Sequence, residues 1–542
     1  MKQIAYFRRE VVIGLLFLVV IGWLVGLSYL PLFDWDEINF AEIAREMLAT
    51  GEFLQPTINY APFHEKPPLF AWLQVGSFRL WGVGSLGARF PNVVCGVFTL
   101  LTLWWWGRRL WGEAFGRWWA AFLGLSILPA LYFRSGIIDP WFNLFILLAL
   151  LPSLTGARLT AGRILAGGWW LGLAVLTKGP AAGLIAGLCW ACLLLFRKES
   201  RLPRVLCYLG IGLLSLVPIG IWLAFLWRVD DGFFAREFLQ YQWRLFFRED
   251  AGHGGFPGYH VVVLLLGCFP ASVYALPLLW ARPQVPGKVA DGGMRILFWV
   301  VLILFSVVST KIVHYSSLCY FPLAYFAARW VTDDLGAVRT ERRVRRGIFA
   351  IWSLYLFLAL VLPLLGSVLP ALIWWIEDQE LVSRLRLPVV WPWYTAIPGL
   401  LIGAGIIVLY RIKNRPRHLR AGAQLLLAWL FLTLALPVFA PRIQQYTQGA
   451  AVEFYRELAG RDVYLGTAYY KSYAHWFYAE LAPEVYDAGC RERQCRFHGP
   501  IAKPLYFSSP LRKKDRVLRE VPDAELLYAR GGFAFYYRPA TP

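Results

Sequence analysis

Charged residues are scarce in this sequence. They make up 16% of its 542 residues, while 58% are hydrophobic, whereas about a quarter of the residues in a soluble domain are charged. This composition excludes a soluble globular enzyme. Long apolar runs recur between residues 11 and 440, and one membrane crossing takes about 20 apolar residues. The sequence therefore predicts a mainly α-helical, polytopic membrane protein.

Acidic residues are fewer than basic ones. The chain has 34 Asp and Glu against 54 Lys and Arg, which gives a formal net charge of +20. Beyond the first ten residues, the cations gather in short loops between apolar runs, at residues 108–117, 158–163, 197–204, 282–295, 339–346 and 411–420. Such loops are typical of the positive-inside rule for membrane proteins. We therefore expect the protein to interact with membrane lipids and not with nucleic acid.

A small-residue cleavage site is lacking after the apolar run from Val11 to Leu30, so this run is predicted to be a first membrane helix and not a signal peptide. Thirteen crossings are predicted, at residues 11–30, 87–106, 118–133, 141–156, 164–177, 180–196, 205–227, 259–281, 296–310, 313–331, 348–375, 392–410 and 421–440. A cytoplasmic N-terminus then puts every basic loop in the cytoplasm and the connections 31–86, 134–140, 228–258 and 376–391 outside. The gap at Thr177–Pro180 is either a tight outer turn or a break in a re-entrant element.

The segment 441–542 differs in character from the membrane region 1–440. Its charges are mixed, and strand-like runs occur at Val463–Leu465, Pro504–Phe507 and Phe533–Tyr537. We expect a small α/β soluble domain, placed outside by the odd number of crossings. Cys490 and Cys495 in this domain form either a local disulfide or two free thiols.

The first outer loop is rich in acids. Asp34, Asp36 and Glu37 lie within four residues at the mouth of a membrane helix, where they repel one another unless they are solvated, paired or facing a cation. The following run Ala41–Leu48 has apolar residues at helical spacing and is predicted to lie as an amphipathic, juxtamembrane helix at the interface. A solvated loop is the alternative interpretation of the acids.

The same loop contains His64–Glu65–Lys66–Pro67–Pro68. Two prolines fix extended backbone geometry, so they can hold Glu65 and Lys66 at a defined angle to the membrane. A fixed lysine suits a lipid phosphate. Snorkelling to the interface explains the lysine alone, but it does not explain the whole motif.

Further ionisable residues fall at the predicted outer ends of helices, and such groups are candidates for function. They are Arg134, Asp139, Arg244, Arg248, Glu249, Asp250 and His253, followed by Lys311, His314 and Tyr315. Asp139 is the strongest candidate among them. Lys311, His314 and Tyr315 either anchor a helix at the interface or join the same cavity.

In order and spacing, these motifs resemble the GT-C class of integral-membrane glycosyltransferases, in particular the bacterial aminoarabinose-to-lipid-A transferases related to protein mannosyltransferases. The resemblance covers roughly residues 8–440. The matching residues are Asp36–Glu37 with Phe40–Ala41–Glu42–Ile43 and Arg45–Glu46–Met47, then Glu65–Leu69, Asp139, His253–Tyr259, Phe269–Pro270, Lys311 with His314–Tyr315, and Pro322.

The resemblance implies catalytic roles for Asp36, Asp139 and Glu37. It implies that Lys66 contacts the phosphate of a polyprenyl-phosphate sugar donor, with Arg45, Arg134, Arg248, Lys311 and Tyr315 as further candidates for that contact. Glu65, His253 and Asp139 are the candidate ligands of a divalent metal, which is Zn, Mg or Mn. One departure is Asn39, since relatives typically carry Arg two residues after the Asp–Glu pair.

The implied reaction is transfer of a sugar to an anionic envelope glycolipid, lipid A or a similar lipid, on the outer face of a bacterial inner membrane. The enzyme is expected to act as a monomer, with its site in the loops 31–86 and 228–258. A protein O-glycosyltransferase is the alternative within this class. A lipid transporter or flippase is the alternative outside it, but it predicts mid-membrane charges and related halves, and the sequence has no internal repeat.

Overall fold

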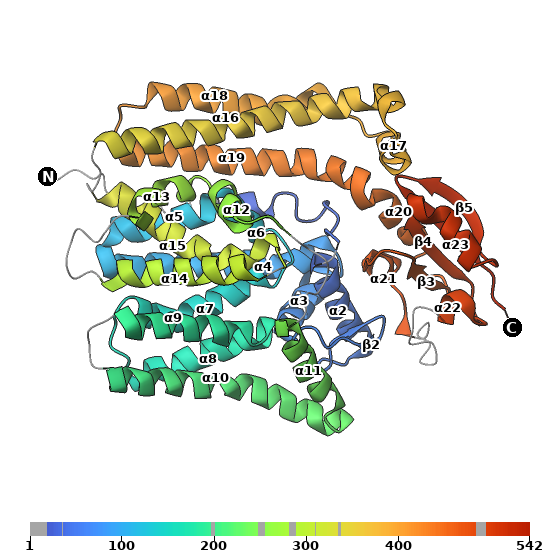
Figure 1. Ribbon diagram of the computed structural model, residues 1–542, viewed down its shortest axis with the longest axis horizontal. Coiled ribbons are helices and arrows are strands. Elements are labelled where there is room, and N and C mark those ends of the chain that lie inside the picture. Colours follow the sequence, from blue (N-terminus) through green and yellow to red (C-terminus); the bar gives the residue numbers. More distant parts are fainter. Residues whose placement is uncertain are drawn as a thin grey trace.

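The structure, a computed structural model, describes residues 19–34, 36–196, 201–247, 255–280, 289–308, 310–333, 338–483 and 495–541. A bundle of long helices runs lengthwise, and a smaller mixed domain sits at one end (Figure 1). We call that end of the bundle the site end.

While the first predicted crossing, 11–30, lies partly outside the described residues, helices occupy the crossings from the second onward. They are α4 (Ser85–Trp111), α5 (Glu113–Leu125), α7 (Asp139–Leu154), α8 (Ala161–Lys178), α9 (Ala181–Phe196), α10 (Arg201–Asp230), α14 (Val289–Val307), α15 (Tyr320–Thr332), α16 (Val338–Val368), α18 (Ile397–Arg411) and α19 (Arg417–Gln444). In the described part of the chain, six helices are long and apolar enough to cross a membrane by themselves. The polytopic, mainly helical fold is confirmed, while the number of thirteen crossings stays a prediction.

The third and the eighth predicted crossings are each divided into two α-helices. The third consists of α5 and α6 (Ile127–Tyr132), and the eighth of α12 (Tyr259–Gly267) and α13 (Ala271–Trp280). The two breaks meet, since the Ile127 amide donates to the Phe269 carbonyl at 3.0 Å and the Ala271 amide to Ser126 Oγ at 3.4 Å. Such bonds satisfy the backbone groups that a break frees inside an apolar bundle.

The gap at Thr177–Pro180 is a tight turn between two helices. Lys178 ends α8, and α9 begins at Ala181. Gly179 has a positive φ of 93° and its amide donates to the Val175 carbonyl, which is the usual way for glycine to end a helix. The re-entrant alternative is therefore wrong, and the alternation of helix directions continues past this point.

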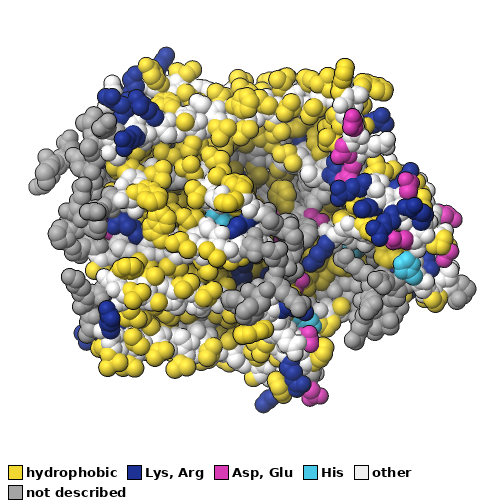
Figure 2. Space-filling view, viewed as in Figure 1, with side chains coloured by type: hydrophobic (Ala, Val, Ile, Leu, Met, Phe, Trp, Pro, Cys, Tyr) yellow, Lys and Arg dark blue, Asp and Glu magenta, His cyan; other side chains and the backbone are white. Residues whose placement is uncertain are grey.

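The described arginine-rich loops lie at the end of the bundle away from the mixed domain. They follow the last turns of α4, α7 and α18 and precede the first turns of α8, α16 and α19. Figure 2 shows lysine and arginine gathered at that far end and on the mixed domain, with an apolar surface between them. The described basic loops thus share one end of the bundle, while their orientation toward the cytoplasm stays a prediction.

Two helices, α2 (Asp36–Thr50) and α3 (Leu69–Trp81), lie between the bundle and the mixed domain (Figure 1). The short strands β1 (Thr57–Ile58) and β2 (Ala61–Pro62) connect them, and α11 (Phe233–Phe247) lies nearby. Every residue of α2 from 37 to 47 is buried. The predicted helix is therefore present at the site end of the bundle, but the mixed domain covers the face that was expected to meet solvent.

The C-terminal region forms the expected α/β domain. Its sheet has the order β3-β4-β6-β5, with β3 parallel to β4 and the other neighbours antiparallel. The strands are β3 (Tyr464–Thr467), β4 (Leu505–Pro510), β5 (Glu525–Arg530) and β6 (Phe533–Arg538), and the helices are α20 (Ala450–Glu457), α21 (Ala474–Ala479), α22 (Cys495–His498) and α23 (Lys514–Glu520). The predicted boundary at residue 440 falls within α19. The prediction for Cys490 concerns a residue outside the described part, and the side chain of Cys495 is also not described.

Candidate active site

The first polar pair of the site end joins α7 to α8. Asp139 opens α7, where a carboxylate is favoured by the helix dipole, and Lys178 closes α8, where a cation is favoured. The Lys178 ammonium lies 2.6 Å from Asp139 Oδ1. The Asp139 side chain is only 3% exposed. The antiparallel α7–α8 hairpin therefore supplies a buried, hydrogen-bonded ion pair.

A histidine links this pair to the first outer loop. His314 Nε2 lies 3.4 Å from Asp36 Oδ2 and 3.9 Å from Asp139 Oδ2. It stands in the short helix η1 (Val313–Cys319) between α14 and α15. Asp36 opens α2 and its side chain is 42% exposed. The two predicted carboxylates thus meet around one imidazole, and Asp36 is the one that remains open to a substrate.

Lys66 faces the same group of side chains. Its ammonium interacts electrostatically with Glu65, Lys178, Asp36 and Asp139, and burial lowers the pKa of Lys66 below its ordinary value of 10.5. No hydrogen bond or ion pair joins this ammonium to another residue of the described part. A partly buried lysine without a fixed partner among the described residues is ready to accept an anionic ligand, since burying an unpaired charge is costly.

Tyr315 belongs to the group as well, because the Lys178 ammonium lies 5.2 Å from the centre of its ring. We call these residues the polar cluster: Asp36, Lys66, Asp139, Lys178, His314 and Tyr315. They come from α2, the loop before α3, α7, α8 and η1. Five segments far apart in the sequence therefore converge on one small volume at the site end.

Glu37 lies next to Asp36 in sequence but points elsewhere. Its carboxylate accepts two hydrogen bonds from Arg89, at 2.9 and 2.7 Å, and others from the amides of Phe33 and Gly136, at 2.8 and 2.6 Å. Both partners of the ion pair are almost fully buried. These four bonds tie α2 to α4 and to the loop before α7, so Glu37 holds the segments that carry Asp36 and Asp139.

Three of the predicted phosphate-binding residues have other partners. Arg45 forms a bidentate pair with Glu42, both bonds at 2.7 Å. Lys311 donates to backbone carbonyls at the end of α14, including Ser306 at 2.7 Å. Arg134 donates to Thr433 of α19 at 3.1 Å. The structure therefore places these three cations outside the polar cluster, and Arg248 lies outside the described residues.

The predicted metal ligands are not gathered in the part of the chain that the structure describes. Glu65 has the Lys471 ammonium 3.7 Å from its carboxylate, and Asp139 faces Lys178 and His314. Within the described ranges, no group of three or more His, Cys, Asp or Glu side chains could hold a metal ion. His253 lies outside those ranges. A divalent metal at this site therefore stays a prediction, and we derive no step through one.

Sequence reasoning missed Lys178, whose signal was present. A lysine next to Gly–Pro inside an otherwise apolar stretch is expensive in a membrane protein and marks a functional candidate. For His314, the sequence leaves open whether it anchors a helix at the interface or joins the cavity. Neither residue lies near Asp139 in sequence, and only the packing of α7 against α8 and η1 brings them together.

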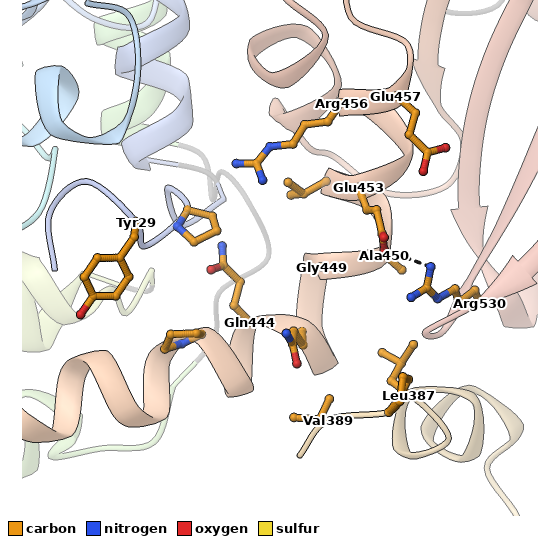
Figure 3. A pocket seen from close by; sticks show the side chains of 15 residues that line it. Tyr29, Leu387, Val389, Gln444, Gly449, Ala450, Glu453, Arg456, Glu457 and Arg530 are labelled. Atoms are coloured by element: carbon orange, nitrogen blue, oxygen red, sulfur yellow. Dashed lines mark ion pairs between the residues drawn. The ribbon is translucent and has the colours of Figure 1, made fainter. Parts of the chain in front are cut away.

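A cavity of about 660 Å³ lies where α19 continues into α20. Its lining includes Pro31, in the segment that leads to Asp36. Figure 3 shows Tyr29 and Gln444 on one side of it and the Glu453–Arg530 ion pair on the other. Gln444 also donates to the carbonyl of Leu32, in the segment that leads to Asp36. Apolar and charged walls together suit an amphipathic molecule.

Comparison with known proteins agrees with this architecture. The family model described as dolichyl-phosphate-mannose-protein mannosyltransferase matches residues 65–224. Crystal structures of ArnT from Cupriavidus metallidurans, one without ligand and one bound to undecaprenyl phosphate, superpose with a TM-score of 0.75 at 18% and 19% identity. They cover 97% of this chain and 98% and 97% of their own. The resemblance expected from the sequence is confirmed.

Relatives also match along much of the sequence. The undecaprenyl phosphate-alpha-4-amino-4-deoxy-L-arabinose arabinosyl transferase of Enterobacter sp. (strain 638) is 27% identical over 333 residues, which cover 59% of each chain. That of Pectobacterium carotovorum subsp. carotovorum (strain PC1) is 28% identical over 405 residues, covering 71% of this chain and 70% of the relative. The chain thus matches less than two thirds of the length of the Enterobacter relative. The GT-C fold is established, with glycosyltransferases as the similar proteins.

Proposed function

We propose that this chain transfers a sugar from a polyprenyl-phosphate donor to an envelope glycolipid, lipid A or a similar lipid. The observation that carries the proposal is the partly buried Lys66 ammonium, which interacts electrostatically with Asp36, Asp139 and Lys178 and has no hydrogen bond or ion pair to a described residue. A phosphate supplies the negative charge that this lysine lacks. The comparison structure bound to undecaprenyl phosphate supports a lipid phosphate as that ligand.

The reaction is a displacement at the anomeric carbon. The bond from that carbon to the donor phosphate oxygen breaks, its electron pair stays on the phosphate, and a new bond forms to an acceptor oxygen. Lys66, and Lys178 through its position beside Lys66, stabilise the charge that accumulates on the leaving phosphate. Asp139 holds Lys178 in place through its 2.6 Å bond.

Asp36 has one of two roles, and the acceptor decides which. A hydroxyl acceptor must lose its proton, and Asp36 is the half-exposed carboxylate placed to take it as a general base. A phosphate acceptor is already ionised near neutral pH, so Asp36 then orients it through the His314 contact. In both cases replacing the carboxylate by an amide stops the reaction.

The donor's lipid is better supported than its sugar. Relatives are named as aminoarabinose transferases that use undecaprenyl phosphate, but Asn39 stands where relatives typically carry Arg. Asn39 is buried on α2, and its Oδ1 has no hydrogen-bond partner among the described residues. We therefore propose that the donor of this chain is also a polyprenyl phosphate, and we assign no particular sugar to it.

We further propose that the site end faces the periplasm of a bacterial inner membrane and that the protein acts as a monomer. The arginine-rich far end of the bundle supports this orientation, since positive loops stay in the cytoplasm. Labelling of single exposed cysteines introduced at Arg158 and at Arg512 tests it. Periplasmic reagents are expected to reach only position 512.

We also propose that a divalent metal, Zn, Mg or Mn, binds at this site, and this proposal is tested separately. Its sequence-derived ligands are Glu65, His253 and Asp139, and the described contacts of Glu65 and Asp139 are to cations instead. Transfer measured with EDTA, and again after adding Zn, Mg or Mn, decides the matter. Full activity in EDTA would remove the metal.

The test of the proposed function uses purified protein in vesicles with an undecaprenyl-phosphate sugar. Lipid A and an acceptor peptide are offered separately, because the match to the mannosyltransferase family model favours a protein acceptor as the second candidate. Sugar on lipid A supports the proposal, and sugar on peptide alone replaces it with protein glycosylation. Movement of the donor across the vesicle without transfer replaces the enzyme with a transporter.

A further inference from the structure

One loop of the C-terminal domain contacts residues that adjoin the polar cluster in sequence. It runs from Ala468 to Tyr473, between β3 and α21. The Tyr473 amide donates to Asp34 Oδ1 at 3.3 Å, two residues before Asp36. The Lys471 ammonium lies 3.7 Å from Glu65 Oε1, one residue before Lys66. The loop therefore forms part of the wall around the candidate site, although it belongs to another domain.

The backbone of this loop is fixed from within its own domain. The Ala468 amide donates to the Ser508 carbonyl at 2.8 Å, and the Tyr470 hydroxyl lies 2.6 Å from Ser508 Oγ. Tyr469 adopts a positive φ of 62°, which a bulky residue keeps only where its surroundings impose it. The sheet of the C-terminal domain thus determines where Lys471 stands.

Lys471 differs from the two lysines of the polar cluster in its exposure. Its side chain is 41% exposed, whereas the Lys178 side chain is 15% exposed and Lys66 is partly buried. The ring of Tyr473 lies 5.4 Å from its ammonium. Lys471 is consequently a positive charge at the open rim of the site, while Lys66 and Lys178 form its interior.

We propose that Lys471 binds a phosphate group of the acceptor lipid. This inference rests on the proposed function, in which Lys66 and Lys178 hold the leaving phosphate of the donor. In a direct displacement, the attacking oxygen approaches the anomeric carbon from the side opposite to the leaving group. The acceptor therefore enters from the open rim, where the Lys471 ammonium lies 3.7 Å from the Glu65 carboxylate.

The C-terminal domain thereby takes part in recognition of the acceptor. The segment 441–542 has 15 Lys and Arg against 11 Asp and Glu, an excess too small to attract a lipid by charge alone. One lysine placed at the rim makes a specific, charge-assisted contact instead. The domain then selects acceptors that carry a phosphate next to the group that receives the sugar.

Binding is measured without catalysis, in full-length protein that also carries Asp36→Asn. Equilibrium dissociation constants are determined for diphosphoryl lipid A, for lipid A stripped of both phosphates, and for undecaprenyl phosphate. We expect Lys471→Ala to raise the dissociation constant for diphosphoryl lipid A about tenfold or more, which corresponds to the loss of one charge-assisted hydrogen bond. The other two dissociation constants stay unchanged, and Lys471→Arg restores most of the affinity.

Lys503→Ala is the matched control, because Lys503 is an ion-paired lysine of the same domain, 2.5 Å from Asp462. It is expected to change none of the three constants. The inference is overturned if Lys471→Ala binds lipid A as tightly as the wild type does, or if the two forms of lipid A bind equally well. It is also overturned if Lys471→Ala weakens the binding of undecaprenyl phosphate. If lipid A binds through Lys471 and wild-type protein transfers no sugar, the inference stands and the proposed function fails.

Discussion

The ammonium of Lys178 lies 2.6 Å from Oδ1 of Asp139, although 39 positions separate the two residues in the sequence. The α7–α8 hairpin brings the start of one helix to the end of the next. This pair anchors the interior of the polar cluster, since His314 and Tyr315 both approach it. It is also the contact whose loss the account predicts to be most informative about the cluster as a unit.

Asp139→Asn and Lys178→Met are each expected to reduce transfer about 100-fold or more, because each leaves the other charge buried without its partner. The double variant is expected to transfer sugar at least as fast as the slower of the two single variants, since the two residues act together. Initial rates of sugar transfer at equal amounts of membrane-inserted protein check this. Rates that multiply in the double variant would show two independent roles.

Lys66 determines an alkaline limit of activity. The protonated ammonium binds phosphate, and burial lowers the pKa of Lys66 below 10.5, so transfer is present below that pKa and falls as the pH rises through it. Lys66→Ala is expected to abolish transfer. Lys66→Arg keeps a charge at every accessible pH, so the alkaline fall should move upward. A pH profile that is identical in wild type and Lys66→Arg contradicts this assignment.

Glu37 is expected to matter for stability. Glu37→Gln weakens the buried pair with Arg89, and breaking such a pair costs about 3–5 kcal/mol. The thermal unfolding midpoint in detergent should fall, and Arg89→Gln should lower it similarly. The sequence-based prediction gave Glu37 a catalytic role, so a variant of normal stability that has lost transfer would favour that role after all.

Glu46 is predicted to make the stability depend on pH. Burial first, and the nearby Glu42 second, raise the pKa of Glu46 above its ordinary value of 4.5. Folding therefore favours the protonated form, whose stabilising effect is complete below the unfolded pKa and is lost as the pH rises through the raised value. Glu46→Gln keeps a neutral side chain at every pH.

The unfolding midpoint of Glu46→Gln should exceed that of wild type near pH 8, and the difference should shrink toward pH 5. The Thr57 hydroxyl at 2.7 Å and the Tyr60 amide at 3.0 Å, both now bonded to Glu46, limit the size of the gain. Thr57→Val serves as the control, because it removes one of these bonds without changing a charge. A difference between Glu46→Gln and wild type that is independent of pH contradicts the raised pKa.

Much of the fold follows from the sequence, because long apolar runs and the charges between them carry information along the chain. The predicted crossing 141–156 is α7 to within two residues, and the runs at Val463 and Phe533 are strands β3 and β6. The exposed strand β5 was missed because its six residues lack a buried face. The burial of α2 was missed because it depends on the C-terminal domain docking upon it.

The site was partly predictable for a similar reason. Asp36, Lys66 and Asp139 stand in local motifs at helix ends, and the structure brings all three together. The partners of Arg45, Lys311 and Glu37 could not be read from the sequence, because a cation or carboxylate looks alike in a motif whether it meets a substrate or a neighbouring helix. Lys178 and Lys471 enter the site only through tertiary packing.

The most direct test of the central claim is mass spectrometry of envelope lipids from cells with and without this protein, beside cells that carry Asp36→Asn. Asp36 is the half-exposed carboxylate of the cluster, and its variant should still be found in the membrane. We predict that one sugar-sized mass disappears from lipid A or a related glycolipid when the protein is removed, and that Asp36→Asn fails to restore it. An unchanged lipid profile, or full restoration by Asp36→Asn, would contradict it.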